Sequence, residues 1–215
     1  MRTNSSESDS SFIGTARRVQ ITQATIEVLA AEGYTGTTMA VIAGRLGVSK
    51  GILSYHFASK AELLQAVVRF VLSEAGEWME QRMHGAASFR GALHSYISAN
   101  LSYLDSHRTE IRALTEVLAN ARATEGVPEL FAASQAQAVH ALEALFDGGR
   151  RAGEFGDVPS RILAVSLRAT IDSTSESLRS DPAFDLSEFE RELLQLFDRA
   201  AGQYDQITLE GASHE

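Results

Sequence analysis

The sequence predicts an all-α protein made of an N-terminal helix-turn-helix domain and a larger helical region. Apolar residues recur at helical spacing along most of the 215 residues, and no strand pattern follows residue 85. The three prolines, Pro128, Pro159 and Pro182, fall where this spacing predicts helix boundaries. Between residues 37 and 60 the helical pattern ends and begins again after two residues. This predicts two short helices that cross at a steep angle.

This segment reads TTMAVIAGRLGVSKGILSYHFASK. Thr38 and Ser49 are each placed to cap a helix, because a hydroxyl can accept from an N–H group one turn further on. Gly47 ends the first helix, since glycine readily adopts the left-handed conformation found at helix C-termini. The two helices lie only two residues apart, which is typical of a helix-turn-helix whose second helix enters the major groove of DNA.

The second helix carries residue types that suit DNA. Lys50 can reach a guanine edge or a phosphate, and Gly51 lets the backbone approach a base. We therefore predict that DNA is bound by Arg17, Arg18, Thr38, Ser49, Lys50, Gly51, Ser54, Tyr55, His56 and Lys60. The alternatives are ordinary surface charges for the two lysines and a solvated helix start for Arg17 and Arg18.

The charge distribution supports this prediction. The whole chain has a net charge of −9, but residues 12–60 carry five basic and two acidic side chains and are therefore cationic. A small cationic domain on an acidic body favours local docking on DNA and suppresses nonspecific binding elsewhere.

The composition excludes other classes. There is no cysteine, no apolar run of about 18 residues that could span a membrane, and no signal peptide at the N-terminus, so we expect a cytoplasmic protein. The six histidines lack metal-binding spacing, and no nucleophile–base or paired-carboxylate pattern indicates an enzyme. We predict no catalytic residue, metal ion or cofactor.

The remaining elements follow from the same periodicity. Residues 1–14 are serine-rich and predict a disordered arm, and residues 15–60 form the DNA-binding domain. Residues 61–206 predict a helical ligand-binding and dimerisation domain, and residues 207–215 a flexible tail. Helices are expected at 16–32, 59–83, 88–105, 107–122, 128–151, 160–179 and 184–205. The 59–83 helix joins the two domains and is expected to transmit any ligand effect to the DNA-binding domain.

The helical region has the composition of a ligand sensor. Met and aromatic side chains form adaptable apolar walls, and amide side chains orient a ligand. The predicted lining residues are Trp78, Met79, Met83, Tyr96, Asn100, Tyr103, Leu114, Glu116, Leu118, Phe131, Gln135 and Asp172. For each of them, core packing is the alternative. Glu116 and Asp172 can be counter-charges for a cation, or pair with Arg112 and Arg168 one turn earlier on the same helices.

The last two predicted helices favour a dimer. Their apolar stripes are broad, and the first carries a neighbouring strip of small residues, Ser166, Ala169 and Ser173, that lets another helix approach closely. Because a helix-turn-helix reader normally uses two copies, we predict a homodimer through about residues 160–205. An intramolecular core is the alternative.

Residues from about 17 to 64 resemble the DNA-binding domain of TetR-family transcriptional repressors. The matching segments are Ile21–Ala24, Gly33–Tyr34, Thr37–Thr38, Ile42–Ala43, Gly47–Gly51, Tyr55–Phe57 and Lys60–Leu63. Beyond residue 64 the resemblance is only architectural. It implies a dimer that binds a palindromic operator and is released by a small lipophilic molecule. Ile52 and Ser54 stand where many members carry polar or aromatic residues, so no operator sequence is carried over.

The alternative function is an architectural DNA-binding or helical interaction protein without a ligand.

Overall fold

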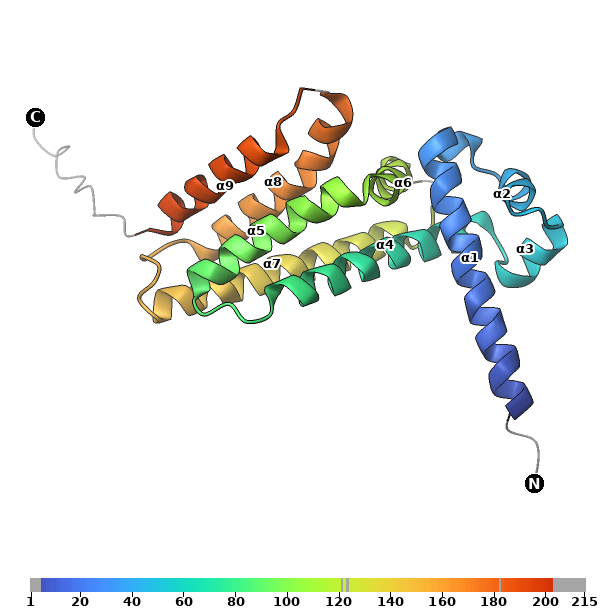
Figure 1. The fold of residues 1–215 in the computed structure, drawn as a ribbon, viewed down its shortest axis with the longest axis horizontal. Helices are drawn as coiled ribbons and strands as arrows, with labels where there is room; N and C mark the ends of the chain where they lie inside the picture. Colours follow the sequence, from blue (N-terminus) through green and yellow to red (C-terminus); the bar gives the residue numbers. More distant parts are fainter. Residues whose placement is uncertain (1–4, 121, 123, 182, 203–215) are drawn as a thin grey trace, which may run out of the picture. The chain divides into compact units, whose positions relative to one another are not determined.

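The chain is all-α, as the sequence predicts, in a computed structural model that describes residues 5–120, 122, 124–181 and 183–202 (Figure 1). The helices of this part of the chain are α1 Ser5–Gly36, α2 Met39–Leu46, α3 Lys50–His56, α4 Lys60–Met83, α5 Phe89–Ser106, α6 Arg108–Ala119, α7 Val127–Arg151, α8 Ser160–Ser180 and α9 Leu186–Ala201. None of these helices is both long and apolar enough to cross a membrane.

The helix bounds agree with the predicted ones to within a few residues, except at the start of α1. This helix begins at Ser5, not at Ala16, and so includes most of the segment predicted to be a disordered arm. No proline interrupts residues 5–15, so a helix that is held in place further along can extend backwards through them. Residues 1–4, Pro182 and the predicted tail at 207–215 lie outside the described residues.

The chain forms two compact units, and their boundaries differ from the predicted division after residue 60. Among the described residues, the first unit contains those of 5–78 and 103–134, and the second contains those of 79–102 and 135–202. α6 and the start of α7 therefore belong to the same unit as the helix-turn-helix. Their apolar side chains, including Ala113, Leu114 and Val127, pack in one cluster with Leu29 of α1 and Val68 of α4.

A separate core in the first unit holds the helix-turn-helix together. Ile21 and Val28 of α1 pack with Ile42 of α2, Leu53 of α3 and Leu63 of α4. Burying apolar surface contributes about 25 cal/mol per Å². These contacts fix α3 on α1, which leaves the opposite side of α3 free to face solvent.

Close helix packing in the second unit depends on two glycines inside α7. A Cβ atom at Gly148 would lie 2.3 Å from the Phe89 ring, and one at Gly149 would lie 2.2 Å from the Phe155 ring. Both distances are shorter than any van der Waals contact, so only glycine allows the two rings to rest on the helix backbone.

Candidate functional site

The turn between α2 and α3 has the capping bonds that the sequence predicts. The Thr38 hydroxyl accepts from the Val41 N–H group at 3.2 Å, and the Ser49 hydroxyl accepts from the Ile52 N–H group at 3.4 Å. Gly47 adopts the left-handed conformation with φ 64°. These bonds satisfy backbone groups at the helix ends and so fix where α3 begins.

α3 has one buried side and one exposed side. Leu53 and the following Phe57 are fully buried, whereas Tyr55 is 86% exposed and Ile52 is 39% exposed. Beside the exposed side lies an open hollow of about 550 Å³, lined by Gly14, Arg17, Ser49, Gly51, Ile52, Tyr55 and His56. The structure thus gathers five of the predicted DNA-binding residues, Arg17, Ser49, Gly51, Tyr55 and His56, around one surface. Lys50 and Ser54 are exposed on the same short helix.

Three of the predicted DNA-binding cations, Arg17, Arg18 and Lys60, have hydrogen-bond partners inside the protein, and those of Arg18 and Lys60 lie on other elements of the fold. The Arg18 guanidinium donates to the His56 carbonyl oxygen and, at 2.9 Å, to the Glu62 carboxylate, and it lies 4.0 Å from the centroid of the Phe57 ring. Arg18 therefore connects α1 to the end of α3, a role that differs from the predicted contact with phosphate or the minor groove.

Lys60 is also directed inwards. Its ammonium group donates to the Tyr34 carbonyl oxygen at 2.9 Å and lies 4.2 Å from the centroid of the Tyr34 ring. An ammonium group over an aromatic face is attracted by the ring quadrupole. Lys60 thus connects α4 to the end of α1, whereas the sequence predicts that it points towards DNA.

Glu62 is a positioning residue that the sequence analysis missed. Its carboxylate accepts from the Ala58 N–H group at 2.8 Å and from Arg18, while the Ser59 hydroxyl accepts from the Glu62 N–H group at 3.1 Å. The bond from Ala58, and then the one from Arg18, lowers the pKa of Glu62 below its usual 4.5. A serine followed three residues later by glutamate is the sequence signal for a capping box, although here Glu62 accepts from the N–H group one residue before Ser59.

The end of α1 is clamped by residues far along the chain. Gly33 has φ 69° and ψ −179°, a conformation essentially restricted to glycine. The next N–H group, that of Tyr34, donates to the Glu116 carboxylate at 3.1 Å, and the Tyr34 hydroxyl bonds with the Thr124 hydroxyl at 2.9 Å. The carboxylate of Glu116, predicted to face a ligand or Arg112, therefore holds the end of α1 against α6.

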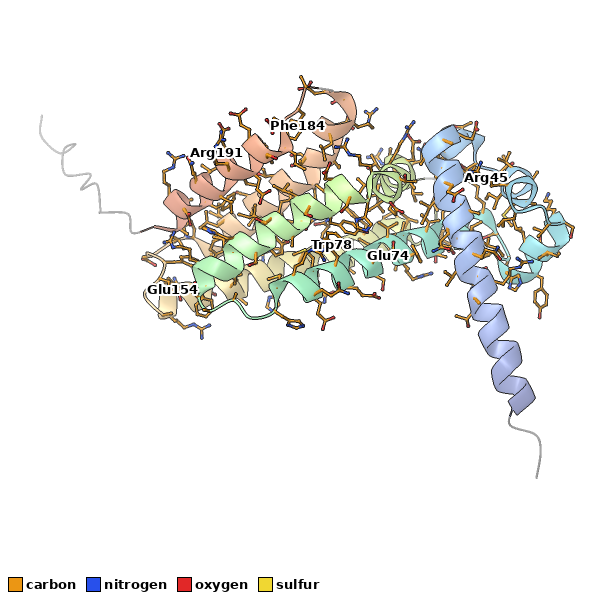
Figure 2. All side chains as sticks on the ribbon, in the orientation of Figure 1. Arg45, Glu74, Trp78, Glu154, Phe184 and Arg191 are labelled. Atoms are coloured by element: carbon orange, nitrogen blue, oxygen red, sulfur yellow. The ribbon has the colours of Figure 1, made fainter. Side chains whose placement is uncertain are left out.

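Three aromatic rings form a second cluster in the same unit. The rings of Tyr103 and His107 stack with centroids 4.1 Å apart, and the Trp78 ring contacts both edge-on at 5.9 and 4.9 Å. Glu74 lies one turn before Trp78 on α4 (Figure 2). Burial and the nearby Glu110 carboxylate raise the pKa of Glu74. Trp78 and Tyr103 belong to the predicted ligand set; His107 does not.

The second unit contains a polar cluster around Arg168 of α8. The guanidinium donates to Gln135 at 3.1 Å, to Asn100 at 3.1 Å, to the Tyr96 hydroxyl at 3.3 Å and to the Asp172 carboxylate. The Arg168 side chain is only 19% exposed. Burial disfavours its charge, but Tyr96 and Asp172 outweigh burial, so the pKa of Arg168 is raised.

This cluster joins four predicted ligand residues through a residue that the sequence analysis treated only as a helix partner. Asp172 forms the predicted pair with Arg168, so its negative charge is already compensated by the protein. The spacing of four residues was the signal for the pair, but nothing local indicated that α5 and α7 would supply three further acceptors.

Comparison with known proteins agrees with the geometry of the N-terminal helices. Residues 21–67 match the family described as bacterial regulatory proteins, tetR family. The N-terminal helices thus match the DNA-binding part of the tetR family. The HTH-type transcriptional regulator BetI of Burkholderia thailandensis is 37% identical over 87 residues, which are 39% of this chain and 44% of that protein. The chain thus aligns with less than half the length of this relative.

Two further similarities extend over more of the chain. The HTH-type transcriptional activator FasR of Mycolicibacterium smegmatis is 29% identical over 170 residues, or 79% of this chain and 75% of that protein. A crystal structure of a regulator from Saccharomonospora viridis in complex with choline shares the fold with a TM-score of 0.78. It is 21% identical and covers 86% of this chain and 96% of its own.

The predicted ligand residues fall in both compact units. Trp78, Tyr103, Leu114, Glu116, Leu118 and Phe131 belong to the first unit, and Met79, Met83, Tyr96, Asn100, Gln135 and Asp172 belong to the second. Leu114 and Leu118 pack with the apolar cluster of α1, α4 and α6, which is the core-packing alternative for these positions. Their role in ligand binding stays a prediction.

Proposed function

We propose that the protein is a ligand-responsive transcriptional regulator that represses by binding a palindromic DNA operator as a dimer. The observation that carries this proposal is the exposed side of α3. It presents Lys50, Gly51, Ser54 and Tyr55 on a helix whose other side is fixed in a core. This is the arrangement in which a recognition helix enters the major groove.

The exposed residues of α8 support a dimer. Ile162 is 64% exposed, and Val165, Ser166, Ala169 and Ser173 continue the same exposed stripe at helical spacing. Large apolar side chains in such a stripe, next to small residues, favour close packing against another helix. In the adjacent α9, Leu196 is also exposed. A two-fold interface through about residues 160–205 would cover these side chains and bring two copies of α3 to one operator.

A small lipophilic effector is the second part of the proposal. The likeness to a regulator in complex with choline supports a small-molecule effector, and the apolar and aromatic side chains among the predicted lining residues support its lipophilic character. The structure argues against Asp172 as the sole counter-charge for a cationic effector, because the Arg168 guanidinium already neutralises it. An effector that lowers DNA affinity has to bind the DNA-incompetent state more tightly, and a coupling of about 1–3 kcal/mol is typical.

DNA binding is tested with Lys50→Ala and Tyr55→Phe. Operator DNA is first selected from a random pool, and affinities are then measured by fluorescence anisotropy at several salt concentrations. Both variants should bind more weakly and remain folded. If Lys50 contacts only a phosphate, its loss should reduce the salt slope by roughly one unit for each protomer and weaken all sequences alike. Unchanged affinity in both variants would refute this role of α3.

The dimer is tested with Ile162→Glu. Light scattering should give a dimer for the wild-type protein at micromolar concentration, and a larger monomer fraction for the variant, because a charge in an apolar interface has to be desolvated. Arg161→Glu, a neighbouring change on the exposed surface of α8, is the control for added negative charge. A monomeric wild-type protein would contradict the proposal.

Ligand response is tested through Trp78, the sole tryptophan in the sequence. Lipophilic cations, acids and neutral metabolites are screened for quenching of its fluorescence and for release of operator. An effector should do both over the same concentration range. Compounds that bind but leave operator affinity unchanged would favour the alternative, an architectural DNA-binding protein without a ligand.

A further inference from the structure

Two neighbouring residues on the exposed side of α3 are poor choices for folding. Gly51 has no positive φ angle, and a Cβ atom there would meet only the Ser49 hydroxyl at an ordinary 3.7 Å. The fold thus leaves room for alanine, which is a much better helix former than glycine. The missing side chain gives no packing advantage within the described residues.

Ile52 is not part of the apolar core of the helix-turn-helix either. It is 39% exposed, and it is absent from the apolar core that Leu53 and Phe57 of the same segment help to form. A β-branched side chain loses rotamer freedom in a helix, and an exposed apolar surface gains nothing from solvent. Gly51 and Ile52 both line the hollow beside α3. Together they make an apolar contact point next to a stretch of bare backbone.

We propose that Ile52 reads the 5-methyl group of a thymine in each operator half-site, and that Gly51 lets the α3 backbone come close enough for this contact. This inference rests on the proposed function and names the base that the exposed side of α3 selects. In the major groove, the thymine methyl is the one apolar group that a base pair presents. The stiff Ile52 side chain is preorganised for such a contact, because its χ1 angle is already restricted.

The neighbouring groups agree with an apolar contact flanked by polar ones. Ser49, Tyr55 and His56, three or four residues from Ile52, line the same hollow, and their side chains can bond to base edges or phosphates. The Ile52 N–H group is already bonded to the Ser49 hydroxyl, so the backbone of Ile52 is held in place before DNA binds.

The test replaces each thymine of the selected operator by deoxyuridine, which removes only the methyl group. For the wild-type protein, one symmetric pair of thymines should be sensitive. The expected loss in affinity is about fourfold for each half-site, the factor that corresponds to about 0.8 kcal/mol per buried methyl-sized group. In the Ile52→Ala variant, the same replacement should have no effect, while Ile52→Val should retain part of the preference.

Val19→Ala is the matched control, because Val19 is 40% exposed on α1, has the same β-branched shape, and does not line the hollow. It should keep the full thymine preference. An operator in which no thymine is sensitive, or an Ile52→Ala variant with an unchanged preference, would overturn the assignment of Ile52 and leave the proposed function intact. Failure to select any specific sequence would overturn the proposed function itself, and the inference with it.

Discussion

The exposed side of α3 and the polar cluster around Arg168 use polar side chains in opposite ways. Within the described residues, Lys50 has no hydrogen-bond or ion-pair partner, whereas Arg168 donates to four side chains from three helices. α3 also includes Gly51 and Ile52, which do not favour a stable helix. Substitutions on the exposed side of α3 should therefore affect DNA binding more than folding. Substitutions in the Arg168 cluster or at the end of α1 should affect folding more than DNA binding. Four experiments test this contrast, beginning with the largest expected effect.

Gly33→Ala should lower the free energy of unfolding by about 2–3 kcal/mol, because φ 69° with ψ −179° is strained for any residue with a side chain. The added Cβ atom would also lie 3.3 Å from the Glu116 carboxylate. Urea denaturation followed by circular dichroism measures this change. The control is Gly44→Ala in α2, where the added Cβ atom meets open space and a small gain in stability is expected. Equal stability of both variants would contradict the assignment of a clamp at Gly33.

Arg168→Met should lower the free energy of unfolding by about 2 kcal/mol, since the Asp172 carboxylate loses a largely buried, charge-assisted partner. Three neutral acceptors lose their donor at the same time. Arg108→Met removes an exposed pair with Asp105 and should leave the stability almost unchanged. If the two substitutions cost the same, the Arg168 cluster contributes no more than a surface ion pair.

Gly51→Ala should show the opposite pattern. The protein should be as stable as the wild type or slightly more stable in thermal denaturation, because alanine favours the helix. Operator affinity should fall roughly tenfold, equivalent to about 1.4 kcal/mol, because the methyl group separates α3 from the groove. A variant that binds operator as tightly as the wild type would remove Gly51 from the interface.

Glu62→Gln should reduce stability in a pH-dependent way. The pKa of Glu62 is lowered in the folded protein, so its carboxylate stabilises the fold above the unfolded value of about 4.5. This contribution is lost as the pH falls through the lower, folded-state pKa. The wild-type protein should therefore be more stable than the variant at pH 7, and the difference should disappear in denaturation experiments as the pH falls below 4.5 and through the folded-state pKa. A difference that persists at low pH would mean that the charge is not the cause.

The sequence alone was sufficient to predict the helices and the helix-turn-helix. Thr38, Gly47 and Ser49 act on backbone groups within one turn of themselves, so their spacing along the chain determines what they bond. The buried and exposed sides of α3 also follow from local periodicity. The predicted start of α1 at residue 16 was wrong. A helix anchored by later residues can extend through a serine-rich segment that has little conformational preference of its own.

The tertiary structure decided which charges remain available at the surface. Arg18 and Lys60 carry the same charge as Lys50, but their partners, His56 and Tyr34, lie 38 and 26 residues away in the sequence. Glu116 meets Tyr34 across 82 residues. A charged side chain bonds to whichever donor or acceptor the fold brings within about 3 Å. The sequence pattern shows only the groups that are near in the chain. That is why local capping could be predicted, whereas the internal partners of Arg18 and Lys60 became visible only in the packed helices.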